Sequence, residues 1–269
     1  MIKPHKPIDE EEYKNHPVFS KLDEILIFYK MLSFSVFGLL KQGAGATCNF
    51  NIDSYLYSSV QGTIESIKYI LKKGRINDAY ALLRKYYDSS IINVYSNLYL
   101  ADNFTLENFV VEKIDNWLKG KEKLPEYRIM SQYIQGSEKL RKINEVLYRD
   151  DRYKEIRDRC NDHAHYNFYQ NVLLNDNEIY LENNIEALSV FLNDIEQLFI
   201  LHLAYIFYLN GHYMMSSDYT DCLDIGITPP EESQYYVAPF VQKAFDDFIK
   251  EKRLDLAETI RLSTEMKLT

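Results

Sequence analysis

Apolar residues recur at helical spacing along most of the chain, and this periodicity predicts a series of long helices. The first is expected from Pro17 to about Gln42, because proline suits a first helical turn and the Gly43-Ala44-Gly45 stretch ends the helix. A second is expected from about Asp53 to Gly74, and a third from Asn77 to about Leu100. The link between these two is so short that they should form an antiparallel helical hairpin.

The rest of the chain is expected to hold several shorter helices and one more long helix. Their expected positions are Thr105 to Leu118, a short helix after Pro125, Ser137 to Tyr148, Asp150 to His165, about 184–210 and about 238–252. Residues 166–182 and 212–235 are expected to be mostly irregular. The pattern therefore predicts an all-α fold, an antiparallel helical bundle with a partly irregular C-terminal extension. We divide it into an N-terminal helical segment (1–50), the bundle (51–210) and an acidic extension (211–269).

Composition supports helices and gives no sign of a membrane or a disulfide framework. Only 9 Gly and 7 Pro occur in 269 residues, too few turn formers for an all-β fold. The most apolar runs, Ile25–Leu40 and Leu198–Leu209, are shorter than the ~20 residues of a membrane span and are interpreted as buried helices. His202, inside the second run, is interpreted as a core histidine.

Three cysteines, Cys48, Cys160 and Cys222, form no CxxC pair. No secretory signal pattern is visible at the N-terminus, so a cytoplasmic location is expected.

Charge is distributed unevenly along the chain. The formal net charge of −9 disfavours generic nucleic-acid binding. Residues 174–269, however, hold 17 acidic and 6 basic residues, whereas the stretch 68–85 is mainly basic. Lys72, Lys73 and Arg75 in that stretch are candidate phosphate contacts, with a solvated basic face as the alternative. The acidic part could bind a basic partner.

The helix expected over Asp150–His165 carries the most informative polar residues. Tyr153, Ile156, Cys160 and Ala164 fall on one stripe and predict a buried seam. One flank of this seam carries Arg157, Asn161 and His165, and the other carries Arg159 and His163. Each flank therefore places a guanidinium and an imidazole side by side at the edge of a buried surface.

These residue types suit cleavage of an RNA phosphodiester without a metal. An imidazole moves protons near neutral pH, and a guanidinium stabilises charge on the phosphorus. An Asn can orient the imidazole or bind the phosphate, and RNA supplies its own 2′-hydroxyl nucleophile. Two alternatives remain open: arginines that pair with nearby carboxylates, and a zinc site at Cys160, His163 and His165. The zinc site is disfavoured because the three side chains leave the helix in different directions.

The string IRDRCNDHAHYN resembles the signature of the HEPN superfamily, whose members are helical bundles that often act as RNases. That signature is an Arg followed, after four to six residues, by a His. Arg159 with His165 fits it, and so does Arg157 with His163, where an acidic residue also follows the arginine; Asp162 is a candidate supporting residue. A related pattern, R-x-x-G-N-x-x-x-H, matches Arg157, Asn161 and His165 with Cys160 in place of Gly. These three matches assign the signature to different residues. We favour the match with Asn161 and His165, and His163 is the alternative histidine.

The resemblance implies a function and further site residues. The stretch 74–95 is similar to an earlier HEPN helix, in which Arg84 and Asp88 would orient the signature arginine. HEPN RNases usually work as homodimers with a composite site, need no cofactor or metal, and leave a 2′,3′-cyclic phosphate. They include toxins, abortive-infection factors and antiviral effectors, some held by a neutralising or regulatory protein. The leading hypothesis is thus a metal-independent endoribonuclease, and the alternative is a non-catalytic HEPN-like interaction protein.

Overall fold

The computed structural model describes residues 7–39, 41–44, 51–175 and 184–269. Regular structure in these ranges is helical, and pairing between extended residues is limited to isolated bridges, such as the one between Gly43 and Val110. The predicted all-α class is therefore confirmed.

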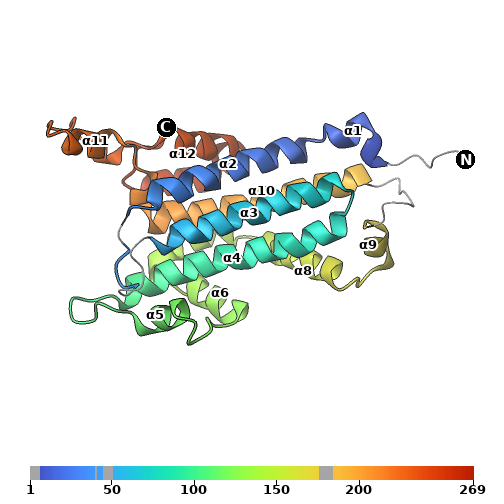
Figure 1. Cartoon of the computed structure of the whole chain (residues 1–269), viewed down its shortest axis with the longest axis horizontal. Coiled ribbons are helices and arrows are strands. Elements are labelled where there is room, and N and C mark those ends of the chain that lie inside the picture. The colour runs from blue at the N-terminus through green and yellow to red at the C-terminus, as the bar shows by residue number, and fades with distance from the viewer. Residues whose placement is uncertain (1–6, 40, 45–50, 176–183) are drawn as a thin grey trace, which may run out of the picture. The chain divides into compact units, whose positions relative to one another are not determined.

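The helices follow one another along the chain in the order labelled in Figure 1. Their bounds are α1 Glu11–Lys14, α2 Pro17–Val36, α3 Ile52–Lys72, α4 Ile76–Asn103, α5 Glu112–Leu118, α6 Tyr127–Gln135, α7 Arg141–Leu147, α8 Arg152–Ala164, α9 Tyr169–Leu173, α10 Asn184–Leu209, α11 Asp218–Asp224, α12 Pro239–Ala244 and α13 Leu254–Ser263. A π-helical segment, Phe245–Lys250, continues α12, and short 3₁₀ turns occur between several helices.

The long helices match the sequence prediction closely. The predicted hairpin is confirmed: α3 and α4 run antiparallel side by side (Figure 1), joined through Gly74 with a φ of +77°. Only glycine adopts this left-handed conformation at little cost, which ends α3 and reverses the chain. The predicted helix starting at Pro17 is also present, but it ends at Val36 instead of Gln42.

One local prediction was wrong, and two were confirmed only in part. Residues 105–111 do not join α5, because the Asn108 amide bonds to Thr105 in a tight turn instead. The stretches 166–182 and 212–235, predicted to be mostly irregular, include the short helices α9 and α11, and residues 176–182 lie outside the described ranges. Short helices of this kind have too few periodic positions to stand out in a sequence.

The residues group into two compact units, each assembled from several parts of the chain. The first unit comprises residues 1–30, 56–90 and 150–199, and the second comprises 31–55, 91–149 and 200–269. The predicted boundaries at 50/51 and 210/211 are not tested by this grouping and stay predictions.

Tyrosine builds much of the core of the first unit. The Tyr29 ring contacts the rings of Tyr57, Tyr86 and Phe199, so α2, α3, α4 and α10 converge on it. Tyr29 and Tyr86 are fully buried, and their hydroxyls share a hydrogen bond of 2.8 Å. Tyrosine is compatible with a dry core where its hydroxyl finds a partner, as Tyr29 and Tyr86 do with each other and Tyr13 does with the Leu71 carbonyl at 2.6 Å.

The second unit is held by apolar packing and by buried polar anchors. Leu100, Val111 and Ile114 pack together where α4 meets α5. The guanidinium of Arg253, which is 7% exposed, donates to the Val146 carbonyl at 3.0 Å and ties the start of α13 to α7. Buried donors of this kind must find partners, which fixes how the helices pack.

One helix in the described ranges is long and apolar enough to cross a membrane by length and composition, namely Asn184–Leu209. In the structure, 78% of its most apolar window is buried. A buried core helix passes the same test, so the finding is weak evidence for a span.

Core packing in the first unit is tested by removing Phe191, which is fully buried against the Tyr80 ring. Phe191→Ala is expected to lower the free energy of unfolding by about 3–5 kcal/mol, because it removes buried apolar surface and leaves a cavity. Phe34, which is 72% exposed, provides the matched control. Phe34→Ala should change the same quantity by less than about 0.5 kcal/mol in urea denaturation. Equal effects of the two substitutions would contradict the packing described here.

Candidate functional site

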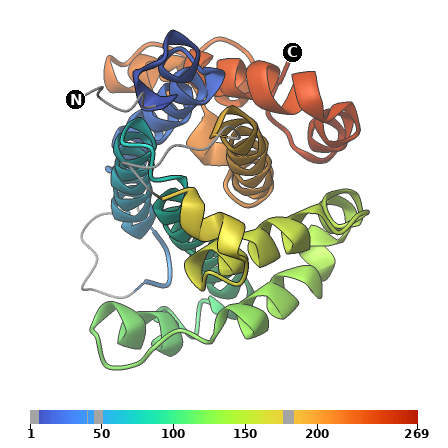
Figure 2. The same ribbon diagram turned by 90° about the vertical axis from the view of Figure 1, so that its right-hand side faces the viewer.

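Helix α8 lies beside the first half of α4 in the first unit (Figures 1 and 2). Tyr153, Ile156 and Cys160 are buried, so most of the predicted seam is confirmed. The prediction was wrong for Ala164, which is exposed at the end of the helix, while His163 is buried instead. Burial of His163 is explained by the partners that α4 offers it, described below.

Two arginines share one carboxylate on the first flank of α8. The Arg157 Nη1 atom lies 2.7 Å from Asp88 Oδ1, and the Arg84 Nε atom lies 3.2 Å from Asp88 Oδ2. Arg84 Nη1 also donates to the Asn161 side-chain oxygen, and the Arg157 guanidinium lies 5.8 Å from the centre of the Tyr87 ring. We call Arg84, Asp88, Arg157 and Asn161 the Arg157 cluster. Arg84 and Asp88, four residues apart on α4, form an ion pair, and Asp88 also pairs with Arg157.

The Arg157 cluster is partly open and carries a net positive charge. Both guanidiniums pair with the Asp88 carboxylate, so the formal charges of the four residues of the cluster sum to +1. The side chains of Arg157, Arg84 and Asp88 are 16%, 25% and 36% exposed. Guanidinium groups in such a setting bind phosphate oxygens through planar N–H donors.

The second flank of α8 is a closed ion-pair network. Arg159 Nε donates to Asp194 Oδ2 at 2.7 Å, and the Tyr80 hydroxyl donates to the same oxygen at 3.2 Å. Asp194 is fully buried; burial raises its pKa, and the Arg159 hydrogen bond and charge oppose that shift. Because a buried carboxylate without its cation is strongly destabilising, Arg159 has a structural role in holding α8 against α10.

His163 is a buried, uncharged histidine. Its ring stacks on Tyr80 at a centroid distance of 3.9 Å, and Nδ1 lies 2.8 Å from the side-chain oxygen of Asn77. Burial, and secondarily the nearby Arg159, lowers its pKa to about 4 despite the opposing charge of Asp162. His163 is therefore neutral at pH 7 and closed to a substrate.

His165, unlike His163, is exposed to solvent and its ring is not held by other side chains of the described residues. It is the exposed residue at the C-terminal end of α8, and its amide donates to the Asn161 carbonyl at 3.0 Å. Its imidazole makes no hydrogen bond or ion pair with a described residue. The structure thus joins Arg157 to Asn161 through Arg84 and Asp88, and leaves His165 one turn beyond Asn161.

The remaining predicted residues are separate from the Arg157 cluster. Lys72, Lys73 and Arg75 are exposed where α3 passes into α4. Asp162 accepts a hydrogen bond of 2.8 Å from Asn167 and does not join the ion pairs.

The cysteines and candidate metal ligands do not form a site in the described ranges. Burial raises the pKa of the Cys160 thiol to about 12, so it is protonated and unreactive. Among the described residues no group of three His, Cys, Asp or Glu side chains could hold a metal ion, and Cys48 lies outside them.

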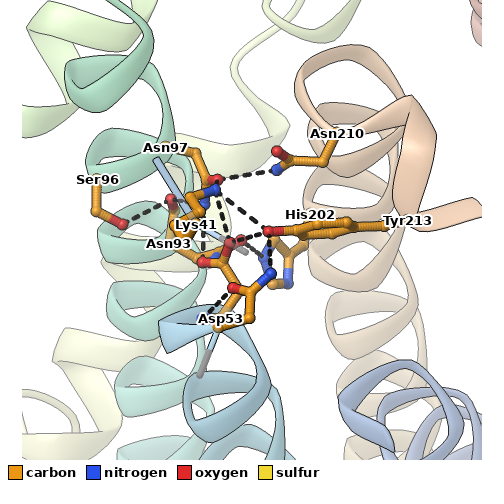
Figure 3. A network of polar contacts seen from close by, with 9 residues as sticks. Lys41, Asp53, Asn93, Ser96, Asn97, His202, Asn210 and Tyr213 are labelled. Atoms are coloured by element: carbon orange, nitrogen blue, oxygen red, sulfur yellow. Dashed lines mark hydrogen bonds and ion pairs between the residues drawn. The ribbon is translucent and has the colours of Figure 1, made fainter. Parts of the chain in front are cut away.

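A second polar network, in the second unit, was not predicted (Figure 3). Buried Asp53 accepts hydrogen bonds from four side chains: Asn93 at 2.7 Å, Asn97 at 2.9 Å, Tyr213 at 2.7 Å and Lys41 at 2.9 Å. We call these five residues the Asp53 network. Asn93 and Asn97, four residues apart on an otherwise apolar helix face, are the only hint of it in the sequence.

His202 belongs to the surroundings of this network and is the core histidine predicted from the sequence. It is fully buried, its Nε2 atom lies 2.9 Å from the Asn93 side-chain oxygen, and burial lowers its pKa to about 3.

The neutral state of His163 predicts a pH dependence of stability. Its pKa lies at about 4 in the folded chain against an ordinary value of 6.5, so between these values the unfolded chain binds a proton that the folded chain does not. Stability should therefore fall as pH drops from about 7.5 to about 4.5, and His163→Gln should reduce that fall by about 2 kcal/mol. The comparison is made by urea denaturation at both pH values, with His165→Gln as the exposed control. An unchanged pH dependence in His163→Gln would show that His163 is not buried in its neutral form.

Comparison of this chain with protein-family models, with curated proteins and with solved structures finds no match. Its function must therefore be argued from the side chains themselves.

Proposed function

We propose that this protein is a metal-independent endoribonuclease of HEPN type, with the Arg157 cluster as its phosphate-binding site. One observation carries the proposal: two arginines share the Asp88 carboxylate at a partly open surface, and an exposed histidine lies two helical turns beyond Arg157 at the end of the same helix. This combination supplies a fixed positive charge and a group that can move protons, which are the two requirements for cleavage beside a 2′-hydroxyl.

In the proposed reaction, the RNA 2′-hydroxyl attacks the adjacent phosphorus and the 5′-oxygen leaves. His165 transfers a proton at one of these two oxygens, and Arg157 stabilises the negative charge that develops on the phosphoryl oxygens. The products are a 2′,3′-cyclic phosphate and a 5′-hydroxyl. Asp88, Arg84 and Asn161 act as positioning residues, because they contact Arg157 or one another and not the reacting atoms.

The geometry favours His165 over His163 for proton transfer. A general acid or base must be reachable and must change its protonation near the working pH. His163 is buried against Tyr80 with a pKa of about 4, whereas His165 is exposed. Arg159 is likewise less suited than Arg157, because its charge balances that of the buried Asp194.

Binding of RNA is supported by exposed residues of two kinds in the first unit. Lys72, Lys73 and Arg75 provide positive charge for phosphates. The segment after His165 exposes two aromatic side chains, Tyr166 at 47% and Phe168 at 58%, on which unpaired bases could stack. The two groups lie near each other, because the Ile76 amide donates to the Leu174 carbonyl at 3.0 Å.

A homodimer forms part of the proposal. Cleavage needs both a base for the 2′-hydroxyl and an acid for the leaving oxygen, and α8 of one chain offers a single exposed histidine, His165. A second copy would contribute its own His165 and Arg157. Tyr169, which is 74% exposed, and Val172, which is 40% exposed, are three residues apart on α9 and provide a surface that such a copy could cover.

A non-catalytic interaction protein is the second candidate. It is favoured by the ion pairs of Arg157 with Asp88 and of Arg159 with Asp194, since such pairs also occur where arginines only hold helices together. In that case the acidic residues of 174–269 would bind a basic partner. Roles as a toxin or a defence effector depend on the first candidate.

The first test is RNA cleavage in EDTA. Wild-type protein is expected to cut single-stranded RNA, and His165→Ala should reduce the cleavage rate by at least about 100-fold because proton transfer is lost. Arg157→Lys should also reduce the rate, because lysine keeps the charge but not the planar pair of donors.

Two variants serve as controls in this assay. His163→Gln should keep most of the activity at neutral pH, and His212→Ala, an exposed histidine in the second unit, should keep all of it. RNA left intact by the wild-type protein, or cut equally by His165→Ala, would reject the endoribonuclease and leave the interaction protein.

The second test is the mass of the particle in solution. Light scattering is expected to give twice the mass of the 31.9 kDa chain. Tyr169→Glu should shift the particle toward the single-chain mass and lower cleavage with it, because a charge is placed on the proposed contact surface. A wild-type particle that is monomeric at all concentrations and still cleaves RNA would exclude the composite site.

A further inference from the structure

A cavity of about 450 Å³ lies against the Asp53 network in the second unit. Its volume falls in the range of about 300–1,000 Å³ that is usual for small-molecule sites. One wall is apolar and is formed by Leu100, Phe104 and Leu209, and the polar wall includes Lys41, Asn97 and Asn210. Figure 3 shows the polar side chains of this wall gathered between α4 and α10.

The positive charge of Lys41, at the polar wall of the cavity, is already balanced by Asp53. Lys41 Nζ donates to Asp53 Oδ2 at 2.9 Å, to the Asn97 side-chain oxygen and to the Tyr213 hydroxyl at 3.3 Å. These bonds use its three protons and balance its charge with that of Asp53. An anion in the cavity would therefore gain little from Lys41.

Other polar groups at the cavity remain available to a ligand. Asn210 is 5% exposed, and its side-chain nitrogen donates to Asn97 at 3.0 Å. Its side-chain oxygen accepts no hydrogen bond from a described residue. Gln42 and His212 also line the cavity, and their side chains make no hydrogen bond with a described residue. Burial, and then the charge of Lys41, lowers the pKa of His212, so this ring is uncharged at neutral pH.

We propose that this cavity binds an uncharged nucleobase or nucleoside. A free carboxamide presents one acceptor and one donor side by side, which matches the hydrogen-bonding edge of a base. Asn210 and Gln42 offer such groups, while Phe104 and Leu209 provide an apolar face for the flat ring. This site lies in a different unit from the Arg157 cluster and does not depend on RNA cleavage.

The proposal is tested by calorimetric titration of the full chain with adenosine, uridine, adenosine monophosphate and inorganic phosphate. At least one of the two nucleosides should bind saturably, and inorganic phosphate should not displace it. Any binding of phosphate or of the monophosphate at the Arg157 cluster should be the same in Gln42→Ala as in the wild type. Gln42→Ala and His212→Ala change exposed side chains and should each weaken nucleoside binding about fivefold to tenfold, the effect of losing about one net hydrogen bond. Asn210→Ala should weaken it further, with its thermal melt recorded to confirm folding.

His165→Ala, in the first unit, is the control and should bind nucleosides as the wild type does. Absence of saturable nucleoside binding would overturn the proposal. So would displacement of the bound nucleoside by inorganic phosphate, or nucleoside binding that neither Gln42→Ala nor His212→Ala weakens. Each result can be read whether or not the protein cleaves RNA.

Discussion

Pairing of buried charge is the constraint on which this structure depends. Asp194 and Asp53 are almost completely enclosed by apolar helices, and each is balanced by one cation and by further hydrogen-bond donors. Removing such a cation would leave a buried charge unpaired, at a cost of about 3–5 kcal/mol. These carboxylates therefore fix which helix faces can meet. Arg159 on α8 must face Asp194 on α10, and Asn93 and Asn97 on α4 must face Asp53 on α3.

The need to pair buried charge also distinguishes the polar residues that stabilise the fold from the polar residues that a substrate could reach. Along α8, the flank that satisfies Asp194 is closed, and His163 is buried with it. The opposite flank holds Arg157 and Arg84, which pair with Asp88 and stay partly exposed, so a ligand can reach them. We therefore assign chemistry to Arg157 and His165 and stability to Arg159 and His163. At the Asp53 network the charges balance internally, and this is why we infer an uncharged ligand for the cavity beside it.

Much of the fold was predictable from the sequence, because long helices repeat their apolar pattern many times. The bounds of α3, α4 and α10 were close, and the buried residues Tyr153, Ile156 and Cys160 were identified correctly. Short helices such as α9 and α11 were not found, since one or two turns give no clear period.

The candidate site was only partly predictable. Spacing placed Arg157, Asn161 and His165 on one face, but it placed His163 on an open flank. Its burial depends on Tyr80 and Asn77, which are more than 80 residues away in the chain. The Asp53 network was missed for the same reason: Lys41, Asp53, Asn97 and Tyr213 meet only in three dimensions.

The chemistry of the ends left on a cut RNA tests the central claim most directly. Mass spectrometry of a short oligoribonucleotide incubated with the protein in EDTA should find a 2′,3′-cyclic phosphate on one fragment and a 5′-hydroxyl on the other, with no cleavage where a single 2′-deoxynucleotide replaces the attacked position. Fragments that end in a 3′-hydroxyl and a 5′-phosphate, or cutting that ignores the missing 2′-hydroxyl, would contradict a site in which Arg157 and His165 assist attack by the RNA itself.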